Sequence, residues 1–144
     1  MIQIFYVDDD ADDREIFLSA ARDIDSVKEK ISIKLYSCGD DFLKEIKKVD
    51  LSEGLIFLDI NMPNKNGFQV LAEIRKEERY QLVPIIMYST SSEDGAIYTS
   101  YELGANLYVV KPDTINGIQK MIERVVEIDW TSFATDMANF LLPH

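Results

Sequence analysis

Five short apolar runs, separated by stretches with helical periodicity, restrict the possible folds of this chain more than any other feature of its sequence. The runs are rich in β-branched and aromatic residues, and most are apolar at consecutive positions, which is typical of strands buried on both faces. They lie at residues 2–7, 31–36, 55–58, 84–88 and 107–110. Strands of this kind occur in parallel sheets covered by helices, so the sequence predicts an α/β fold.

The stretches between these runs carry apolar residues three and four positions apart, a spacing that lines one face of a helix. Helices are expected from this spacing at residues 12–24, 39–46, 68–74, 96–103 and 115–128. The repeated alternation of strand and helix predicts a doubly wound, five-stranded parallel sheet flanked by five helices. Ligands of such sheets bind outside the carboxyl ends of the strands, so functional residues are expected directly after the strands.

Polar residues do follow four of the five predicted strands. They are Asp8, Asp9 and Asp10 after the first strand, Asp59 after the third, Ser89 and Thr90 after the fourth, and Lys111 after the fifth. Carboxylates that converge at one edge of a sheet raise each other's pKa unless a cation lies among them. Mg²⁺ prefers oxygen ligands and suits this set, whereas zinc and copper are not expected because the cluster has no neighbouring His or Cys.

Asp59 is the candidate nucleophile of this cluster. It follows the central strand, and aspartate carboxylates form covalent phosphoryl intermediates. Phosphoryl transfer depends on charge neutralisation and positioning more than on acid–base chemistry. A metal ion, the ammonium group of Lys111 and the hydroxyl group of Ser89 would meet these two needs.

Four motifs in a fixed order resemble the receiver domains of response regulators. They are Tyr-Val-Asp-Asp-Asp at residues 6–10, Phe-Leu-Asp-Ile-Asn-Met-Pro at 57–63, Tyr-Ser-Thr at 88–90 and Tyr-Val-Val-Lys-Pro at 108–112. The resemblance spans residues 2–128 and implies a flavodoxin-like sheet with the strand order 2-1-3-4-5. It also implies a stand-alone receiver of a two-component phosphorelay. A histidine kinase or a histidine phosphotransfer protein would phosphorylate it, and it would signal by conformational switching to a protein partner.

The resemblance assigns a metal site to the acidic motif residues. Asp59 resembles the phosphoacceptor and Asp9 a direct ligand of Mg²⁺ or Mn²⁺. Asp8 resembles a partner that holds the metal mainly through water. Asn61 matches the position whose backbone carbonyl completes the protein ligands of the metal.

The other motif residues resemble those that bind the phosphoryl group and respond to it. Lys111 matches the cation of the site, Ser89 the hydroxyl that follows the phosphoryl group, and Tyr108 the aromatic switch residue that turns inward. The peptide bond between Lys111 and Pro112 is expected to be cis, a state that proline makes low in energy. Thr90 stands where Ala or Gly is common. Its larger side chain is expected to hinder an attacking water and to slow the loss of phosphate.

Residues 129–144 continue beyond the predicted receiver domain of residues 1–128. Their apolar side chains share one face of a helix, so a C-terminal helical extension is expected. They are Phe133, Met137, Phe140 and Leu141. This face and Trp130 are too apolar to be left in water, so they are expected to pack on the receiver or to form a homodimer surface. The extension is too short for an independent domain.

Composition excludes several other classes of protein. The formal net charge of −11 argues against a nucleic-acid partner, which would require a broad basic surface. No apolar stretch approaches the roughly 18 residues of a membrane helix, so membrane insertion is not expected. Cys38 is the single cysteine, which excludes an internal disulfide and favours a reducing compartment. The cytoplasm is therefore the expected location.

Two alternative functions stay open at this point. A phosphatase that acts through an aspartyl phosphate would favour a second Asp two residues beyond the nucleophile, where this chain has Asn61. Catalysis is therefore expected to extend only to self-catalysed phosphotransfer and slow autodephosphorylation. A pseudo-receiver would keep the fold as a protein-interaction module that is not phosphorylated. The acidic pair, Asp59, Ser89 and Lys111 argue against it.

Overall fold

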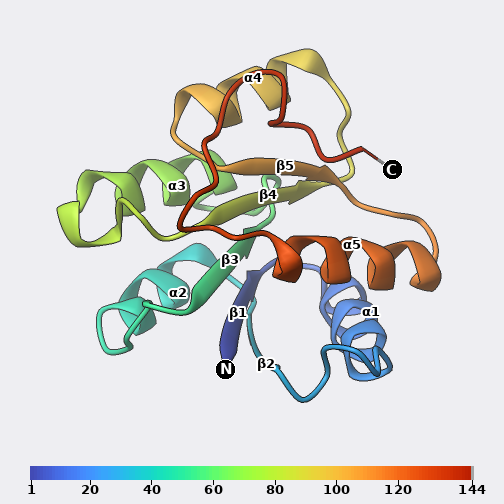
Figure 1. The fold of residues 1–144 in the computed structure, drawn as a ribbon. Helices are drawn as coiled ribbons and strands as arrows, with labels where there is room; N and C mark the ends of the chain where they lie inside the picture. Colours follow the sequence, from blue (N-terminus) through green and yellow to red (C-terminus); the bar gives the residue numbers. More distant parts are fainter. Residues whose placement is uncertain (144) are drawn as a thin grey trace.

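The structure, a computed structural model, describes residues 1–143. Its centre is a five-stranded parallel sheet in the order β2-β1-β3-β4-β5, the order expected from the sequence (Figure 1). The strands are β1 (Ile2–Val7), β2 (Ile31–Tyr36), β3 (Gly54–Leu58), β4 (Ile85–Ser89) and β5 (Leu107–Val110). The predicted strand positions are confirmed to within one residue at each end.

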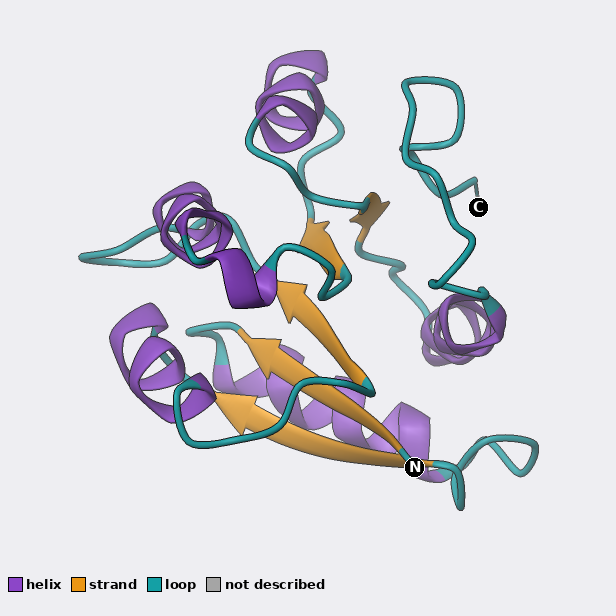
Figure 2. Cartoon of the chain, turned by 60° about the vertical axis from the view of Figure 1, so that its left-hand side comes forward, coloured by secondary structure: helices purple, strands orange, loops and turns teal. Residues whose placement is uncertain are grey.

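Within residues 1–143, five α-helices and one short 3-10 helix accompany the strands, and the last helix follows β5. They are α1 (Ala11–Arg22), α2 (Gly39–Ile46), α3 (Gly67–Lys76), η1 (Glu78–Tyr80), α4 (Asp94–Glu102) and α5 (Ile115–Glu127). Helices α1 and α5 cover one face of the sheet, and α2, α3 and α4 cover the other (Figures 1 and 2). Among the described residues, no helix has both the length and the apolar character needed to cross a membrane.

The sheet separates two apolar cores. Along β1, Phe5 and Val7 belong to the core beneath α2 and α3, whereas Ile4 and Tyr6 belong to the core beneath α1 and α5. All four side chains are at most 1% exposed. Because both faces of the strand are buried, its consecutive residues are apolar. Full burial of a large apolar side chain stabilises the fold by about 1.5–3 kcal/mol.

Side-chain caps begin the helices that follow β1 and β3. The Asp10 carboxylate accepts the backbone N–H groups of Asp12 at 2.9 Å and Asp13 at 3.1 Å, which starts α1. Asn66 and Gln69 form a reciprocal capping box at the start of α3. Each cap contributes about 1 kcal/mol and fixes the turn between strand and helix. These turns carry the candidate functional residues.

The expected helix in the C-terminal extension is wrong. Residues 129–143 contain turns and irregular chain, and their one regular feature is a parallel bridge between Leu141 and Tyr108 of β5. The backbone N–H of Tyr108 donates to the carbonyl of Phe140 at 2.8 Å, and the N–H of Leu142 donates to the carbonyl of Tyr108 at 2.9 Å. The end of the chain therefore lies along the outer edge of β5. His144 lies outside the described residues.

Local hydrogen bonds explain why the apolar spacing of this extension does not produce a helix. The Asp129 side chain accepts from Thr131, and the Asp136 side chain accepts from the backbone N–H groups of Ala138 and Asn139. Such side chains offer the backbone an alternative to helical hydrogen bonds. The expectation that the extension packs on the receiver is met by Phe140, which is 1% exposed.

Candidate functional site

The candidate site lies at the carboxyl ends of the central strands, where the sequence predicts it. Asp8 follows β1, Asp59 follows β3 and Ser89 ends β4; their side chains are buried, with exposed fractions of 0%, 6% and 0%. Lys111 follows β5 and is partly buried. Because these strands are parallel neighbours, residues far apart in the sequence meet at one edge of the sheet.

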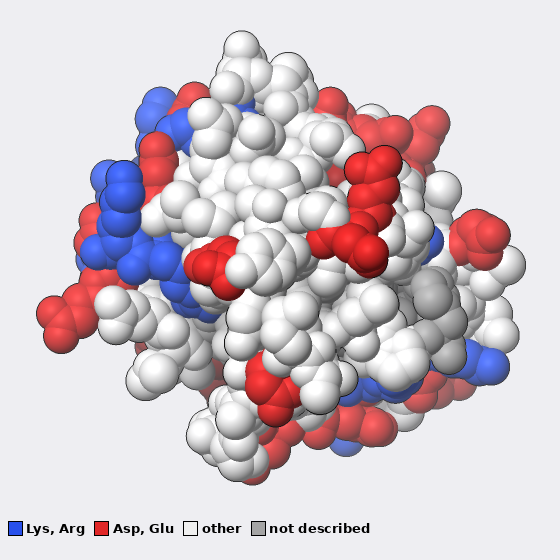
Figure 3. Space-filling view, turned by 90° about the horizontal axis from the view of Figure 1, so that it is seen from above, with Lys and Arg blue, Asp and Glu red and all other residues white. Residues whose placement is uncertain are grey.

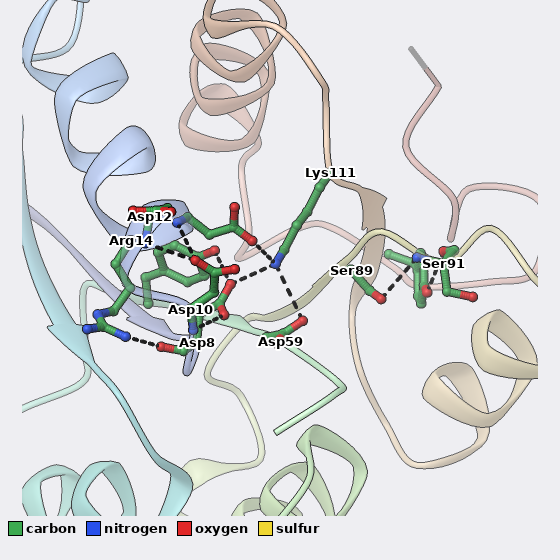
Figure 4. A network of polar contacts seen from close by, with 11 residues as sticks. Asp8, Asp10, Asp12, Arg14, Asp59, Ser89, Ser91 and Lys111 are labelled. Carbon is green, nitrogen blue, oxygen red and sulfur yellow. Dashed lines mark hydrogen bonds and ion pairs between the residues drawn. The ribbon is translucent and has the colours of Figure 1, made fainter. Parts of the chain in front are cut away.

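Lys111 is the centre of the polar network (Figure 4). Its Nζ atom lies 2.7 Å from Asp8 Oδ2, 2.9 Å from Asp13 Oδ2 and 3.6 Å from Asp59 Oδ1. It also lies 5.6 Å from the centre of the Tyr88 ring, close enough for a cation–π interaction. Burial alone would lower the pKa of Lys111, but the hydrogen bonds to Asp13 and Asp8 outweigh it and raise this pKa. Lys111 is therefore held as a cation.

Asp8 is fixed by three different donors. Its Oδ2 atom accepts the Tyr6 hydroxyl at 2.5 Å and the Lys111 ammonium at 2.7 Å, and its Oδ1 atom accepts the backbone N–H of Asp10 at 2.9 Å. The Arg14 guanidinium donates to the Asp8 carbonyl at 2.8 Å. Burial, and then the bond to Asp8, raises the pKa of Tyr6, so its hydroxyl stays a donor. A buried carboxylate requires such pairing.

Asp59 lies in a tight turn that glycine makes possible. The Asp59 backbone N–H continues the sheet by donating to the Val7 carbonyl at 2.9 Å, and the Gly67 N–H donates to the Ile60 carbonyl at 2.8 Å. A Cβ atom on residue 67 would lie 2.1 Å from the Asp59 carbonyl oxygen. The absent side chain therefore lets the start of α3 pack directly against the backbone of Asp59.

The electrostatics of Asp59 are those of a buried carboxylate among other carboxylates. Burial raises its pKa from 3.8 to about 7; Lys111 opposes this shift, while Asp8 and Asp9 add to it. Ligand oxygens of Asp8, Asp9 and Asp59 all lie within 4.8 Å of one another. This all-oxygen set fits a divalent cation such as Mg²⁺ or Mn²⁺, whose charge would offset that of the carboxylates.

Ser89 and Tyr108 both bond to Ser91, which lies in the loop between β4 and α4. The Ser89 hydroxyl accepts the backbone N–H of Ser91 at 3.2 Å, and the Tyr108 hydroxyl donates to the Ser91 carbonyl at 2.8 Å. Tyr108 is fully buried, so its ring lies inside the protein. Thr90, between the two serines, is exposed. A movement of Ser89 would therefore change the loop that holds the Tyr108 hydroxyl.

Two sequence expectations at this edge have different outcomes. Asn61 lies in the exposed turn two residues beyond Asp59, and the role of its carbonyl stays a prediction. The expected cis bond before Pro112 is wrong, because residues 1–143 contain no cis peptide. Cis and trans X–Pro bonds differ by only about 0.5–1 kcal/mol, so local contacts decide between them and the dipeptide alone does not.

Asp13 belongs to the network, although its place in the predicted helix of residues 12–24 indicates no role in the site. It is the third residue of α1, and side chains of a first turn lean toward the helix N-terminus, which here faces the end of β1. The position of Asp13 in the first turn of the helix that follows β1 is therefore the sequence feature that would identify it as a site residue. The sequence also indicates no site role for Tyr6 and Arg14, because an aromatic within a strand and a basic residue on a helix carry no distinctive pattern.

A family model described as "Response regulator receiver domain" matches residues 4–123 of the chain. Among curated proteins, the response regulator Rcp1 of Synechocystis sp. is 35% identical over 81 residues, which cover 56% of this chain and 54% of Rcp1. A chemotaxis protein CheY homolog of Campylobacter jejuni is 33% identical over 72 residues, which cover 50% of this chain and 55% of the homolog. The chain thus spans about half the length of the curated relatives it matches.

Solved structures resemble most of the chain. The phosphorylated cyanobacterial phytochrome response regulator RcpA is 27% identical, with a TM-score of 0.75 over 93% of this chain and 96% of RcpA. CheY4 of Vibrio cholerae is 24% identical, with a TM-score of 0.73 over 87% and 98% of the two chains. The Mn²⁺-bound form of Rcp1 is 23% identical, with a TM-score of 0.71 over 94% and 99%. The last two support the fold alone.

Proposed function

Because this chain belongs to the response-regulator receiver domain family, we propose that it accepts a phosphoryl group on Asp59 and signals by changing its contacts with a protein partner. The observation that carries the proposal is the placement of Asp59. It lies 3.6 Å from the Lys111 ammonium, and one of its carboxylate oxygens lies within 4.8 Å of one oxygen each of Asp8 and Asp9. A nucleophile, a fixed cation and an all-oxygen metal site are the parts that phosphoryl transfer requires.

The phosphoryl group would come from a phosphohistidine of a histidine kinase or a histidine phosphotransfer protein. An Oδ atom of Asp59 forms a bond to phosphorus while the bond from phosphorus to the donor nitrogen breaks, and that nitrogen keeps the electron pair. Lys111 is charged and already held by Asp8 and Asp13, so it needs little rearrangement to pair with a phosphoryl oxygen.

The metal site we propose comprises Asp8, Asp9, Asp59 and the backbone carbonyl of Asn61. A bound Mg²⁺ or Mn²⁺ neutralises negative charge on the carboxylates and the phosphoryl oxygens. Two observations support such a site: the three carboxylates lie together, and burial, with a smaller contribution from Asp8 and Asp9, raises the pKa of Asp59. The related Rcp1 structure is described as Mn²⁺-bound, and the related RcpA structure as phosphorylated.

The switch we propose connects Ser89 to Tyr108. A phosphoryl group on Asp59 draws the Ser89 hydroxyl toward it, and the loop that contains Ser91 follows because Ser91 bonds to Ser89. Tyr108 bonds to the same loop, so its inward position depends on the loop conformation. The face formed by α4, β5 and α5 then changes shape for a partner.

Output through a protein partner agrees with the charge of the molecule. Figure 3 shows the face over α4 and the C-terminal extension, where acidic side chains lie among uncharged ones and Lys and Arg lie toward the margins. With a formal net charge of −11, a nucleic-acid partner is not proposed. We place the protein in the cytoplasm, with residues 1–128 as the receiver domain. The loss of phosphate would be slow, because Thr90 stands beside the site.

An intact-mass measurement tests the proposal. The full-length protein is incubated with Mg²⁺ and a small phosphodonor such as acetyl phosphate, beside Asp59→Asn and a sample with EDTA. We expect one added phosphoryl group on the wild type with Mg²⁺ and none in either control. An unmodified wild type, also after incubation with a histidine kinase, would favour the pseudo-receiver. Rapid turnover of varied phosphate esters would favour the phosphatase.

A further inference from the structure

The C-terminal extension lies against the residue proposed as the switch. Residues 140–142 run along the outer edge of β5, and both backbone hydrogen bonds of this pairing involve Tyr108. Its N–H donates to the Phe140 carbonyl at 2.8 Å, and its carbonyl accepts from Leu142 at 2.9 Å. The extension thus occupies the position that a sixth strand would have. Without it, the outer edge of β5 would be an open sheet edge.

Phe140 is the anchor of this docked segment. Its ring is 1% exposed and lies between two tyrosines, with ring centres 5.3 Å from Tyr101 of α4 and 6.4 Å from Tyr108 of β5. Leu141 of the same segment is 44% exposed, and Met137, which precedes the segment, is 56% exposed. Leu142 is partly buried against the core beneath α1 and α5, so Phe140, Leu142 and the two backbone bonds hold the segment.

The rest of the extension holds this segment in register. The Thr135 hydroxyl donates to the Asn106 carbonyl at 3.1 Å, directly before β5. The Arg124 guanidinium of α5 donates to the Pro143 carbonyl, just beyond the paired residues. Trp130 packs against Phe133 with ring centres 5.0 Å apart, and its Nε1–H donates to the Val125 carbonyl at 3.3 Å. The extension is thus attached to α5 and to β5.

The binding site of the Phe140 ring, which we call its seat, is formed by the rings of Tyr101 and Tyr108, so it depends on the position of Tyr108. Tyr108 is fully buried although β5 is the last strand of the sheet, because Phe140 and its segment cover it. A Tyr108 ring that swung outward would have to displace Phe140. An inward ring, bonded to the Ser91 carbonyl at 2.8 Å, leaves the seat intact. The docked segment and the inward ring therefore stabilise each other.

We propose that residues 140–142 are a releasable edge strand whose docking on β5 is coupled, through Tyr108, to phosphorylation of Asp59. This inference rests on the proposed function. Phosphorylation stabilises the loop conformation that holds Tyr108 inside and so strengthens docking. Docking in turn must strengthen binding of a phosphoryl analogue, because coupling between two sites is reciprocal. Release of the segment exposes the β5 edge and the Tyr101–Tyr108 seat to a partner.

Two measurements on the full-length protein test this coupling. The first is the affinity for beryllofluoride, an analogue of the phosphoryl group, titrated with Mg²⁺ present. Phe140→Ala is expected to weaken this affinity by about fivefold or more, whereas the matched control Met137→Ala, at an exposed position of the C-terminal extension outside the paired residues, leaves it unchanged. The second is hydrogen exchange at the Leu142 and Tyr108 amides, which beryllofluoride should slow in the wild type.

Further variants separate the possible outcomes. Leu142→Pro removes one paired N–H and keeps Phe140, so it should weaken the affinity even if Phe140→Ala folds poorly. Asp59→Asn should show no change in amide exchange on addition of beryllofluoride. The coupling alone would be overturned if the wild type binds beryllofluoride with unchanged hydrogen exchange at the Leu142 amide. It would also be overturned if Phe140→Ala and Leu142→Pro bind beryllofluoride with the affinity of the wild type. Wild-type protein that does not bind beryllofluoride would overturn the proposed function and the coupling with it.

Discussion

Asp59→Asn replaces a buried carboxylate whose ionisation lowers the free energy of unfolding. Burial raises the pKa of Asp59 from 3.8 to about 7, and Asp8 and Asp9 add to the shift while Lys111 opposes it. A pKa difference of this size corresponds to about 4 kcal/mol between folded and unfolded protein. Asn has nearly the same shape and carries no charge. It should therefore remove most of this cost at a pH where Asp59 is ionised.

The sign of the effect follows from proton binding. Between pH 3.8 and about 7 the folded protein holds a proton on Asp59 that the unfolded chain has released. The free energy of unfolding of the wild type therefore falls as the pH rises through this window. Above it, Asp59→Asn should be more stable than the wild type by about 2–4 kcal/mol, and near about pH 4 the two should be equal.

Urea unfolding between about pH 4 and pH 8 measures this difference, with EDTA present to remove divalent cations. Added Mg²⁺ should raise the stability of the wild type at the upper end of this range, because a cation that binds only the folded carboxylates stabilises it by mass action. Asp59→Asn should gain less. A variant no more stable than the wild type near pH 8, or a difference that persists near pH 4, would refute the electrostatic argument.

Three further predictions concern the surroundings of the site. Gly67→Ala should lower the free energy of unfolding by about 2–4 kcal/mol in urea titrations, since its Cβ atom would lie 2.1 Å from the Asp59 carbonyl oxygen; an unchanged midpoint would contradict the turn geometry. Arg75→Ala should cost about 2 kcal/mol in the same assay, because its guanidinium donates to Gly104, Tyr80 and Asn106; a loss near zero would show that these bonds are dispensable. Thr90→Ala should shorten the phosphoryl half-life, followed by intact mass after removal of the donor, and an equal or longer half-life would exclude steric shielding by Thr90.

The fold and the main site residues can be predicted because each depends on a local sequence pattern. The apolar runs indicate the strands, and the polar residues directly after them indicate the site. Runs such as residues 2–7 are apolar at nearly every position, and only strands covered on both faces bury such runs. Once the strands are parallel, Asp8, Asp59 and Lys111 must meet, since each directly follows a strand. The residues at the carboxyl-terminal edge of the sheet can therefore be predicted from the order of strands and helices, without knowledge of side-chain contacts.

The features that the sequence does not predict depend on competition between local and distant contacts. The spacing of Phe133, Met137 and Phe140 fits a helix, yet hydrogen bonds within the turns and the open edge of β5 stabilise an extended segment instead. The isomer of the bond before Pro112 is decided by a difference of about 0.5–1 kcal/mol. Asp13 joins the site only through the orientation of the first turn of α1, which the pattern of acidic residues does not reveal.

Locating the phosphoryl group tests the central claim most directly. The protein is treated with a small phosphodonor and Mg²⁺, digested under acidic conditions that preserve acyl phosphates, and analysed by tandem mass spectrometry. The account predicts one acyl phosphate, on the peptide that contains Asp59, with none when Mg²⁺ is replaced by EDTA. A phosphoryl group on another residue, or one acquired equally well without a divalent cation, would contradict it.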